Sequence, residues 1–410
     1  MRAYNDIRIE KHAKKDWKPF LNFIHALEER KNLAENVKSL PFFLYLDPTT
    51  YCNLQCPFCT TGQRIGARSV ANMGLPTFEH IIDEIGSNLF HIGFYNWGEP
   101  LLNKDFTKMV NHIQKYYITS DVSTNLSFPI DEFQAKKLVD SGLDMIIMSV
   151  DGITQETYQK YRVGGNLELV LKNMKLLSKA MMSSKNDSVN LLWRFFVFKH
   201  NQHEMEDAKK IAKEIGVDIM FAKPFIDPSK FDEWASTIDE YRDHFWPYDD
   251  GKRDIPTKLG VTNPNKELLP WESRITFSGG CDWLWFTAAI NANGSVSPCC
   301  VTTFEKQDFG NIENQSLLEI RNNKTYVNAR KFTAGKSNDP SITMICQRCP
   351  APEIMNTSDW TNVAIIRALL QKLPSEYEEV KKTPINNFDW NFVDKLKSII
   401  QNEILKQNVV

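Results

Sequence analysis

The segment FFLYL at residues 42–46 is followed closely by CNLQCPFC at residues 52–59, so an apolar, strand-like run leads into three clustered cysteines. Cys52, Cys56 and Cys59 follow the pattern C-x3-C-x2-C. Three thiolates can hold three irons of a 4Fe–4S cluster and leave the fourth iron open to a ligand that is not protein. Zinc is the alternative, but a structural zinc site needs four ligands, and no fourth Cys or His follows within 20 residues.

Strand-like and helix-like segments alternate from this point onward. Strands are predicted at residues 44–47, 92–95, 119–123, 145–150, 191–198 and 218–222, with helices at 78–85, 106–116, 131–140, 167–180 and 204–215 between them. Short connections and near-continuous apolar strands predict a parallel sheet buried on both faces. In a parallel barrel, functional residues gather at the C-terminal ends of the strands.

The cysteine spacing, placed directly after a first strand, resembles the signature of the radical S-adenosylmethionine (SAM) enzymes. This resemblance implies an α/β fold, a partial (β/α)6 TIM-like barrel, with the cysteine motif on the loop after the first strand. It also implies that Cys52, Cys56 and Cys59 hold a 4Fe–4S cluster which reduces SAM to methionine and a 5′-deoxyadenosyl radical. That radical would abstract a hydrogen atom from the substrate.

The strand ends carry further matches to this family. Residues 98–100 (GEP) resemble its Gly-Gly-Glu-Pro motif, with Trp97 where the family usually has Gly. Residues 123–125 (STN) and 149–152 (SVDG) resemble two more runs, for which helix capping is the alternative role. The resemblance assigns SAM contacts to Gly98, Glu99, Ser123, Asn125, Ser149, Arg162 and Arg194. For both arginines, a substrate contact or a surface ion pair is the alternative.

A second group of cysteines lies near the C-terminal end. Cys281, Gly294 and Cys299 follow the pattern C-x12-G-x4-C. Farther along the chain, Cys346 and Cys349 form C-x2-C. This pattern resembles the SPASM extension of radical SAM enzymes in its shortened "twitch" form, which implies one auxiliary 4Fe–4S cluster closed by these four cysteines. Zinc is the alternative for four cysteines alone. Cys300 is one cysteine too many, and we expect it to be a spare buried thiol, with an exchange of ligand as the alternative.

The remaining composition is ordinary for a globular protein. The 410 residues are 42% hydrophobic with a net charge of −2, which gives no footprint for nucleic acid. No apolar run approaches a membrane span, and no secretion signal opens the chain, so we expect a cytoplasmic protein with no membrane partner. Grouped cysteines in a reducing compartment favour metal binding over disulfides.

We expect five parts along the chain: an N-terminal helical extension (1–41), the radical SAM partial barrel (42–225), a linker or insertion (226–280), a small cysteine-rich auxiliary cluster domain (281–350) and a C-terminal helical tail (351–410). The aromatic residues beside Cys281, Trp283 and Trp285 among them, are expected to pack in the core.

The resemblance implies two 4Fe–4S clusters and SAM as cofactors, and an electron donor such as flavodoxin or ferredoxin. A closed auxiliary cluster is a ready acceptor for a second electron, so we expect a radical SAM oxidoreductase that dehydrogenates a small polar substrate, such as a sugar or aminocyclitol. Modification of a peptide, by epimerisation or crosslinking, is the alternative. Only 41 residues precede the first strand, which disfavours an N-terminal peptide-docking domain. A non-catalytic iron–sulfur or zinc scaffold is the alternative from another class.

Overall fold

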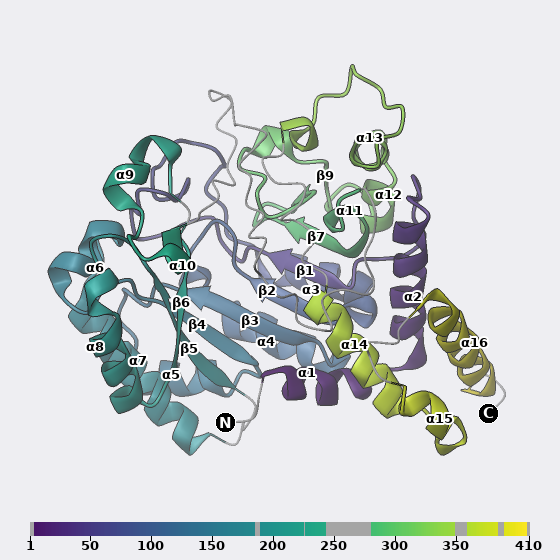
Figure 1. The fold of residues 1–410 in the computed structure, drawn as a ribbon, viewed down its shortest axis with the longest axis horizontal. Coiled ribbons are helices and arrows are strands. Elements are labelled where there is room, and N and C mark those ends of the chain that lie inside the picture. Colours follow the sequence, from purple (N-terminus) through teal and green to yellow (C-terminus); the bar gives the residue numbers. More distant parts are fainter. Residues whose placement is uncertain are drawn as a thin grey trace.

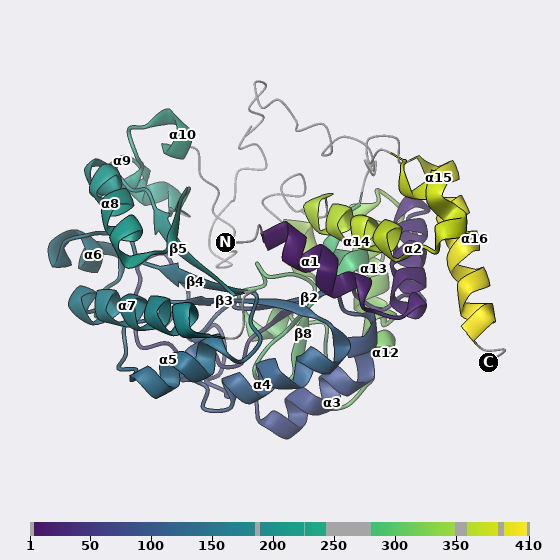
Figure 2. The ribbon, with the colours of Figure 1, turned by 90° about the horizontal axis from the view of Figure 1, so that it is seen from below.

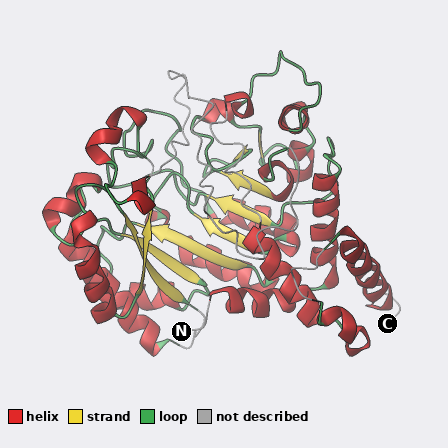
Figure 3. Cartoon of the chain, in the orientation of Figure 1, coloured by secondary structure: helices red, strands yellow, loops and turns green. Residues whose placement is uncertain are grey.

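The computed structural model describes residues 4–184, 189–224, 226–242, 280–348, 359–383 and 389–407. The predicted alternation of strands and helices is confirmed (Figures 1 and 3). The six parallel strands are β1 (Phe43–Leu46), β2 (His91–Phe94), β3 (Thr119–Thr124), β4 (Met145–Ser149), β5 (Asn190–Phe196) and β6 (Asp218–Ala222). They pair in simple order from β1 to β6, each parallel to the next.

Helices between these strands cover one face of the sheet. They are α3 (Leu75–Ile85), α4 (Phe106–Ile113), α5 (Glu132–Val139), α6 (Gln155–Tyr161), α7 (Leu167–Ser183) and α8 (Met205–Ile215), with the short α9 (Phe231–Trp234) and α10 (Asp239–Arg242) after β6. Alternation along each strand explains the layering. Leu44 and Leu46 of β1 are fully buried in the main hydrophobic core, whereas Phe43 and Tyr45 point to the other, inner face and are half-buried.

The C-terminal cysteine-rich segment continues the same sheet instead of forming a separate one. It contains α11 (Trp283–Phe286), β7 (Thr287–Ile290), β8 (Ser295–Ser297), β9 (Gly310–Asn311), α12 (Leu317–Arg321) and α13 (Lys324–Thr333). Strand β7 pairs in parallel with β1, and β8 and β9 follow in antiparallel order. The described sheet is therefore open and nine-stranded, and it runs from β6 to β9.

The N- and C-terminal helices pack together beside and beneath the sheet (Figure 2). They are α1 (Tyr4–Ala13), α2 (Trp17–Lys31), α14 (Asp359–Lys372), α15 (Glu378–Lys381) and α16 (Trp390–Gln407). One face of α2 is apolar and fully buried, and it includes Phe20, Phe23 and Leu27. Lys11 of α1 forms an ion pair with Asp144, just before β4, so α1 lies at the N-terminal strand ends. In the part of the chain described, every helix is too short or too polar to cross a membrane.

Candidate functional site

The three clustered cysteines lie on the loop between β1 and α3. Cys56 is buried, and Cys52 and Cys59 are half-buried. Between them, Leu54 and Phe58 pack into a satellite core with Tyr161 and Phe198, which fixes the loop against α6 and the end of β5.

Gly62 lets this loop fold back on itself. A Cβ at Gly62 would lie 2.5 Å from the Cys56 backbone nitrogen and 2.6 Å from its carbonyl oxygen. Such distances do not occur between non-bonded atoms, and backbone atoms cannot rotate out of the way. The loop that presents the cysteines therefore requires glycine at this position.

The surroundings of these thiols fit an iron–sulfur cluster. Asn125 Nδ2 lies 3.7 Å from Cys52 Sγ, and Arg162 Nη1 lies 3.8 Å from Cys56 Sγ, so each sulfur faces an N–H donor. Hydrogen bonds to the sulfurs tune clusters of this kind. Burial raises the pKa of Cys52 to about 12 and that of Cys56 to about 11, so cluster binding releases protons at neutral pH. Among the described residues, no three His, Cys, Asp or Glu side chains lie close enough to bind a single metal ion. An iron–sulfur cluster does not need such close ligands, because each thiolate binds a different iron.

The end of β2 lies against the cysteine loop. A Cβ on Gly98 would be 1.8 Å from the Thr49 carbonyl oxygen, and the Glu99 amide donates to the Tyr51 carbonyl at 2.8 Å. The Glu99 side chain is 2% exposed and accepts the Asn125 backbone amide at 2.7 Å. Burial raises the pKa of Glu99 to about 7. The strand ends of β2 and β3 thus meet beside Cys52, as the parallel order requires.

Three of the predicted site residues converge on the inner face of β3, β4 and β5. Arg194 Nη2 donates to Ser123 Oγ at 2.9 Å and to Ser149 Oγ at 2.8 Å, and the two hydroxyl oxygens are 3.2 Å apart. Arg194 Nε has no partner in the described part of the chain. The guanidinium therefore retains a donor for an anionic or hydroxyl ligand.

Arg162 is held in a different place. Its Nε donates to Asp151 Oδ2 at 2.6 Å, and Asp151 is fully buried.

The alternative in which the Ser-Thr-Asn and Ser-x-Asp-Gly runs cap helices is wrong, because the N-caps of α5 and α6 are Asp131 and Thr154. SAM contact by these runs stays a prediction.

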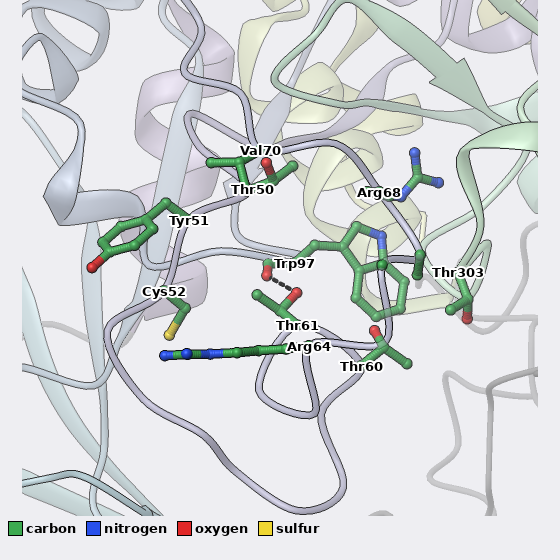
Figure 4. Close-up of a pocket in the computed structure, with 12 residues that line it drawn as sticks. Thr50, Tyr51, Cys52, Thr60, Thr61, Arg64, Arg68, Val70, Trp97 and Thr303 are labelled. Carbon is green, nitrogen blue, oxygen red and sulfur yellow. Dashed lines mark hydrogen bonds between the residues drawn. The ribbon is translucent and has the colours of Figure 1, made fainter.

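Beside the cysteine loop lies a cavity of about 390 Å3, lined by Cys52, Thr61, Arg64 and Trp97, together with Thr303 of the C-terminal segment (Figure 4). Figure 4 shows the Trp97 indole between the cysteine loop and Thr303. The Trp97 backbone amide donates to Asp47 at 3.0 Å, so the position that is usually Gly in the family is held by the end of β1. No sequence motif marked Arg64 or Thr303, which meet only in the folded chain.

The second group of cysteines lines a largely apolar cavity of about 280 Å3. Cys281, Cys299 and Cys346 share it with Trp283 and Ile345, and this donor set suits an iron–sulfur cluster. The predicted fourth ligand, Cys349, lies outside the described residues. Cys300 does not line this cavity; it packs against the cluster of Trp283, Cys299 and Val301, within electrostatic range of Tyr45. The expectation of a buried thiol is wrong in this respect, because Cys300 is half-buried.

An aromatic contact connects this cavity with the inner face of the sheet. The Trp283 ring stacks on Tyr45 with centroids 4.9 Å apart, and Tyr45 meets Tyr95 edge-on at 5.6 Å. Tyr95 Oη donates to Asp121 Oδ2 at 3.4 Å, and His91 Nε2 lies 2.9 Å from Asp121 Oδ1.

Sequence reasoning missed these inner-face residues. The polar alternation of Thr119, Asp121 and Ser123 along β3 was the available signal. The expectation of core packing is met by Trp285, which is fully buried, whereas Trp283 lines the cavity as well.

Family models match the two regions that hold the cysteines. The model described as "Radical SAM superfamily" matches residues 46–209, and the model described as "Iron-sulfur cluster-binding domain" (SPASM) matches residues 281–350. These matches cover the cysteine loop with β2 to β5, and the second cysteine group. They imply SAM and two 4Fe–4S clusters as cofactors.

Several characterised proteins are similar to this chain. A GTP 3′,8-cyclase of Limosilactobacillus fermentum is 25% identical over 215 residues, which are 50% of this chain and 60% of the relative. A GTP 3′,8-cyclase of Clostridium botulinum is 24% identical over 69% of this chain and 89% of its own length. Mycofactocin maturase MftC of Mycobacterium ulcerans is 24% identical over 45% of this chain and 47% of its own.

Solved structures agree on the fold. SuiB of Streptococcus suis, in a structure bound to S-adenosylmethionine, has a TM-score of 0.52 at 16% identity and covers 77% of this chain and 72% of its own. The cysteine loop and the two family matches show that the chain is a radical SAM enzyme with a SPASM-type iron–sulfur cluster-binding domain.

Proposed function

We propose that this chain is an oxidoreductase that removes two electrons from a small polar substrate, such as a sugar or aminocyclitol, held on the inner face of the sheet. The observation that carries the proposal is the contact between the second cysteine cavity and this face, through Trp283 and Tyr45. When bound, SAM and the two clusters supply hydrogen-atom abstraction and an acceptor for the second electron.

We propose the ligand sets that follow from the sequence. Cys52, Cys56 and Cys59 hold the first cluster, and Cys281, Cys299, Cys346 and Cys349 hold the second. Gly98, Glu99, Ser123, Asn125, Ser149, Arg162 and Arg194 bind SAM. The burial of Glu99 and the shared hydrogen bonds of Ser123, Ser149 and Arg194 support these roles, because they hold polar groups in fixed positions out of bulk water.

The oxidation also requires that a proton leave the substrate. With SAM and the second cluster bound, these groups would accept one hydrogen atom and one electron from the substrate, so the remaining proton would need an acceptor from the protein. Asp121 is our candidate for that acceptor, reached through the Tyr95 hydroxyl that donates to it. Burial lowers the pKa of His91 to about 4, so the other partner of Asp121 is neutral at pH 7.

We further propose a flavodoxin- or ferredoxin-type electron donor, a cytoplasmic location and the five-part division of the chain given above. Peptide modification is the second candidate function. It is favoured by the similarity to a mycofactocin maturase and by the fold shared with SuiB, a structure of which is bound to the precursor peptide SuiA.

One experiment separates these functions. The reconstituted enzyme, reduced under anaerobic conditions, is incubated with SAM and panels of sugars, aminocyclitols and peptides in deuterated buffer. We expect a polyol to stimulate formation of 5′-deoxyadenosine and to yield a product two hydrogens poorer without solvent deuterium. A product of unchanged redox level that carries solvent deuterium would establish epimerisation instead, and stimulation by peptides alone would establish the second candidate.

A further inference from the structure

Three arginines are fully buried beside the second cysteine cavity. Arg30 comes from α2, Arg321 from the end of α12 and Arg330 from α13, and none is more than 1% exposed. These helices lie side by side at the end of the sheet that contains β7, β8 and β9 (Figure 1). Both Arg30 and Arg330 also lie over the ring of Trp285, at 5.0 and 6.0 Å from its centroid.

In the part of the chain that the structure describes, the hydrogen bonds of Arg321 and Arg330 go only to backbone carbonyl groups. Arg321 donates to the carbonyls of Thr287 and Trp285 at 2.9 and 2.7 Å. Arg330 donates to Leu284 O at 3.1 and 3.0 Å, and also to Glu35 O and Arg321 O. Within the described ranges, neither forms an ion pair with a carboxylate.

Among the described residues, Arg321 and Arg330 have a single carboxylate within electrostatic range. Asp282 binds Arg30 at 2.6 Å, and Glu29 acts on Arg321 and Arg330 only at longer range. Burial, reinforced by the Arg321 charge, lowers the pKa of Arg330 to about 9, so it stays cationic at pH 7. Burying a charge without a counter-charge costs free energy, so a further anion close by would stabilise Arg321 and Arg330.

The arginines contact the segment that lines the cysteine cavity. Leu284, whose carbonyl accepts from Arg330, lines this cavity with Cys281. Arg30 binds Asp282, the residue directly after Cys281. Tyr326 lies between the arginines and the cysteines. Its phenol is within electrostatic range of Arg321 and Arg330, and also of the Cys299 and Cys346 sulfurs.

We propose that Arg321 and Arg330, the two of these arginines without a carboxylate partner among the described residues, act on the cluster held by the second cysteine group and raise its reduction potential, which makes it a better electron acceptor. Four thiolates carry more negative charge than an iron–sulfur core neutralises, and reduction adds another negative charge. Buried cations favour that reduced state, and net charge is one determinant of cluster potentials. This inference rests on the ligand set proposed above and not on the identity of the substrate.

The test measures the potential directly in the full-length chain. The Cys52→Ala/Cys56→Ala/Cys59→Ala variant isolates the second cluster, whose reduced fraction is then followed by paramagnetic resonance during a redox titration. In this background, we expect Arg330→Gln to lower the ratio of reduced to oxidised cluster about tenfold at fixed potential, which is 59 mV for a one-electron couple. Arg330→Lys, which keeps the charge but not the carbonyl contacts, should stay within about twofold of the parent.

Controls separate charge from structure. Lys331→Gln removes a half-buried cation that already pairs with Glu35 at 3.2 Å, and it should leave the potential unchanged. Equal shifts in Arg330→Gln and Arg330→Lys, or no shift in either, would overturn the inference. If Arg330→Gln loses its cluster, Arg321→Gln and Arg321→Lys decide by the same comparison. Absence of iron from the triple-Ala parent would overturn the ligand set and this inference with it, whatever the outcome for the substrate.

Discussion

The carboxylate of Glu99, at the end of β2, accepts the backbone amide of Asn125, at the end of β3, across 2.7 Å. This hydrogen bond joins the two strand-end motifs that the sequence marked separately. Asn125 also directs its side-chain amide at Cys52 Sγ and at Asn53, so the carboxylate, the amide and the cysteine loop form one connected group. A change at Glu99 therefore acts on the predicted SAM site without removing a cluster ligand.

We predict that Glu99→Gln weakens SAM binding at least about tenfold, because a hydrogen bond to a charged group contributes about 1.5–3 kcal/mol. The amide keeps the shape of the side chain and one acceptor for Asn125, so the fold should persist. Equilibrium dialysis of labelled SAM against the reconstituted protein measures the effect. The matched control is Glu156→Gln, on the exposed surface of α6. Equal affinity in both variants would remove Glu99 from the SAM site.

The second prediction concerns Asp47, which is 1% exposed and accepts the Trp97 backbone amide. Burial raises its pKa from 3.8 to about 7. Between pH 3.8 and about 7, the folded cluster-free protein keeps a proton on Asp47, whereas the unfolded chain has released it. The stabilisation is therefore full below pH 3.8 and is lost as the pH rises through about 7.

Asp47→Asn should remove this dependence, because the amide is neutral at every pH. Relative to wild type, the free energy of unfolding of the variant should improve by on the order of 3 kcal/mol between pH 4 and pH 8. Urea denaturation of both apoproteins at several pH values gives the difference. Parallel profiles would show that Asp47 is already ionised in the folded protein.

The third prediction concerns the first cluster. The Cys52→Ala/Cys56→Ala/Cys59→Ala variant should hold about four irons, against about eight in the wild type, as expected for two 4Fe–4S clusters. It should also lose SAM cleavage, because no open iron remains. Iron analysis and chromatographic measurement of 5′-deoxyadenosine check both. Continued formation of 5′-deoxyadenosine would mean that the open-iron cluster is bound elsewhere.

The fourth prediction distinguishes Cys300 from its neighbours. Cys299 lines the cavity with Cys281 and Cys346, whereas Cys300 does not. Cys300→Ala should keep about eight irons, and Cys281→Ala should fall toward about four, since a closed cluster loses one of its ligands. Cys349→Ala should behave as Cys281→Ala does. Loss of iron from Cys300→Ala alone would exchange the roles of the two adjacent cysteines.

Local patterns in the sequence predicted the elements well, because strands and helices here depend on apolar spacing. The six parallel strands appear where expected. The pairing of β7 with β1, through Tyr45 and Ala289, was not predictable, since it joins residues far apart in the chain. The same holds for the inner-face contacts of Arg194 and Asp121, which depend on the register between neighbouring strands.

The burial of three arginines could not be predicted from the sequence. Arg30, Arg321 and Arg330 carry no motif, and in a sequence an arginine is by default a surface residue. Their burial results from three helices meeting around the carbonyls of α11 and the start of β7. Cysteine spacing located the second site, but the charges around it became visible only in the folded chain.

The fifth prediction concerns Gly98, where the two strand ends approach most closely. In Gly98→Ala, the new Cβ would lie 1.8 Å from Thr49 O and 2.7 Å from the Thr49 carbonyl carbon. Both are backbone atoms of the loop that leads into Cys52, so relief requires moving that loop. We expect a loss of at least about 3 kcal/mol in the free energy of unfolding, at the upper end for overpacking, together with loss of SAM binding.

Gly74→Ala is the matched control for this substitution. Gly74 precedes α3 with φ of −74°, and its new Cβ would meet only Pro76 Cδ, at an ordinary 3.8 Å. Its cost should stay below about 1 kcal/mol, with SAM affinity unchanged. Urea denaturation and SAM dialysis on both variants make the comparison. If Gly98→Ala keeps wild-type stability, the backbones of Gly98 and Thr49 are not in close contact. If it also keeps wild-type SAM affinity, the backbone of residues 98–99 has no special role in holding SAM.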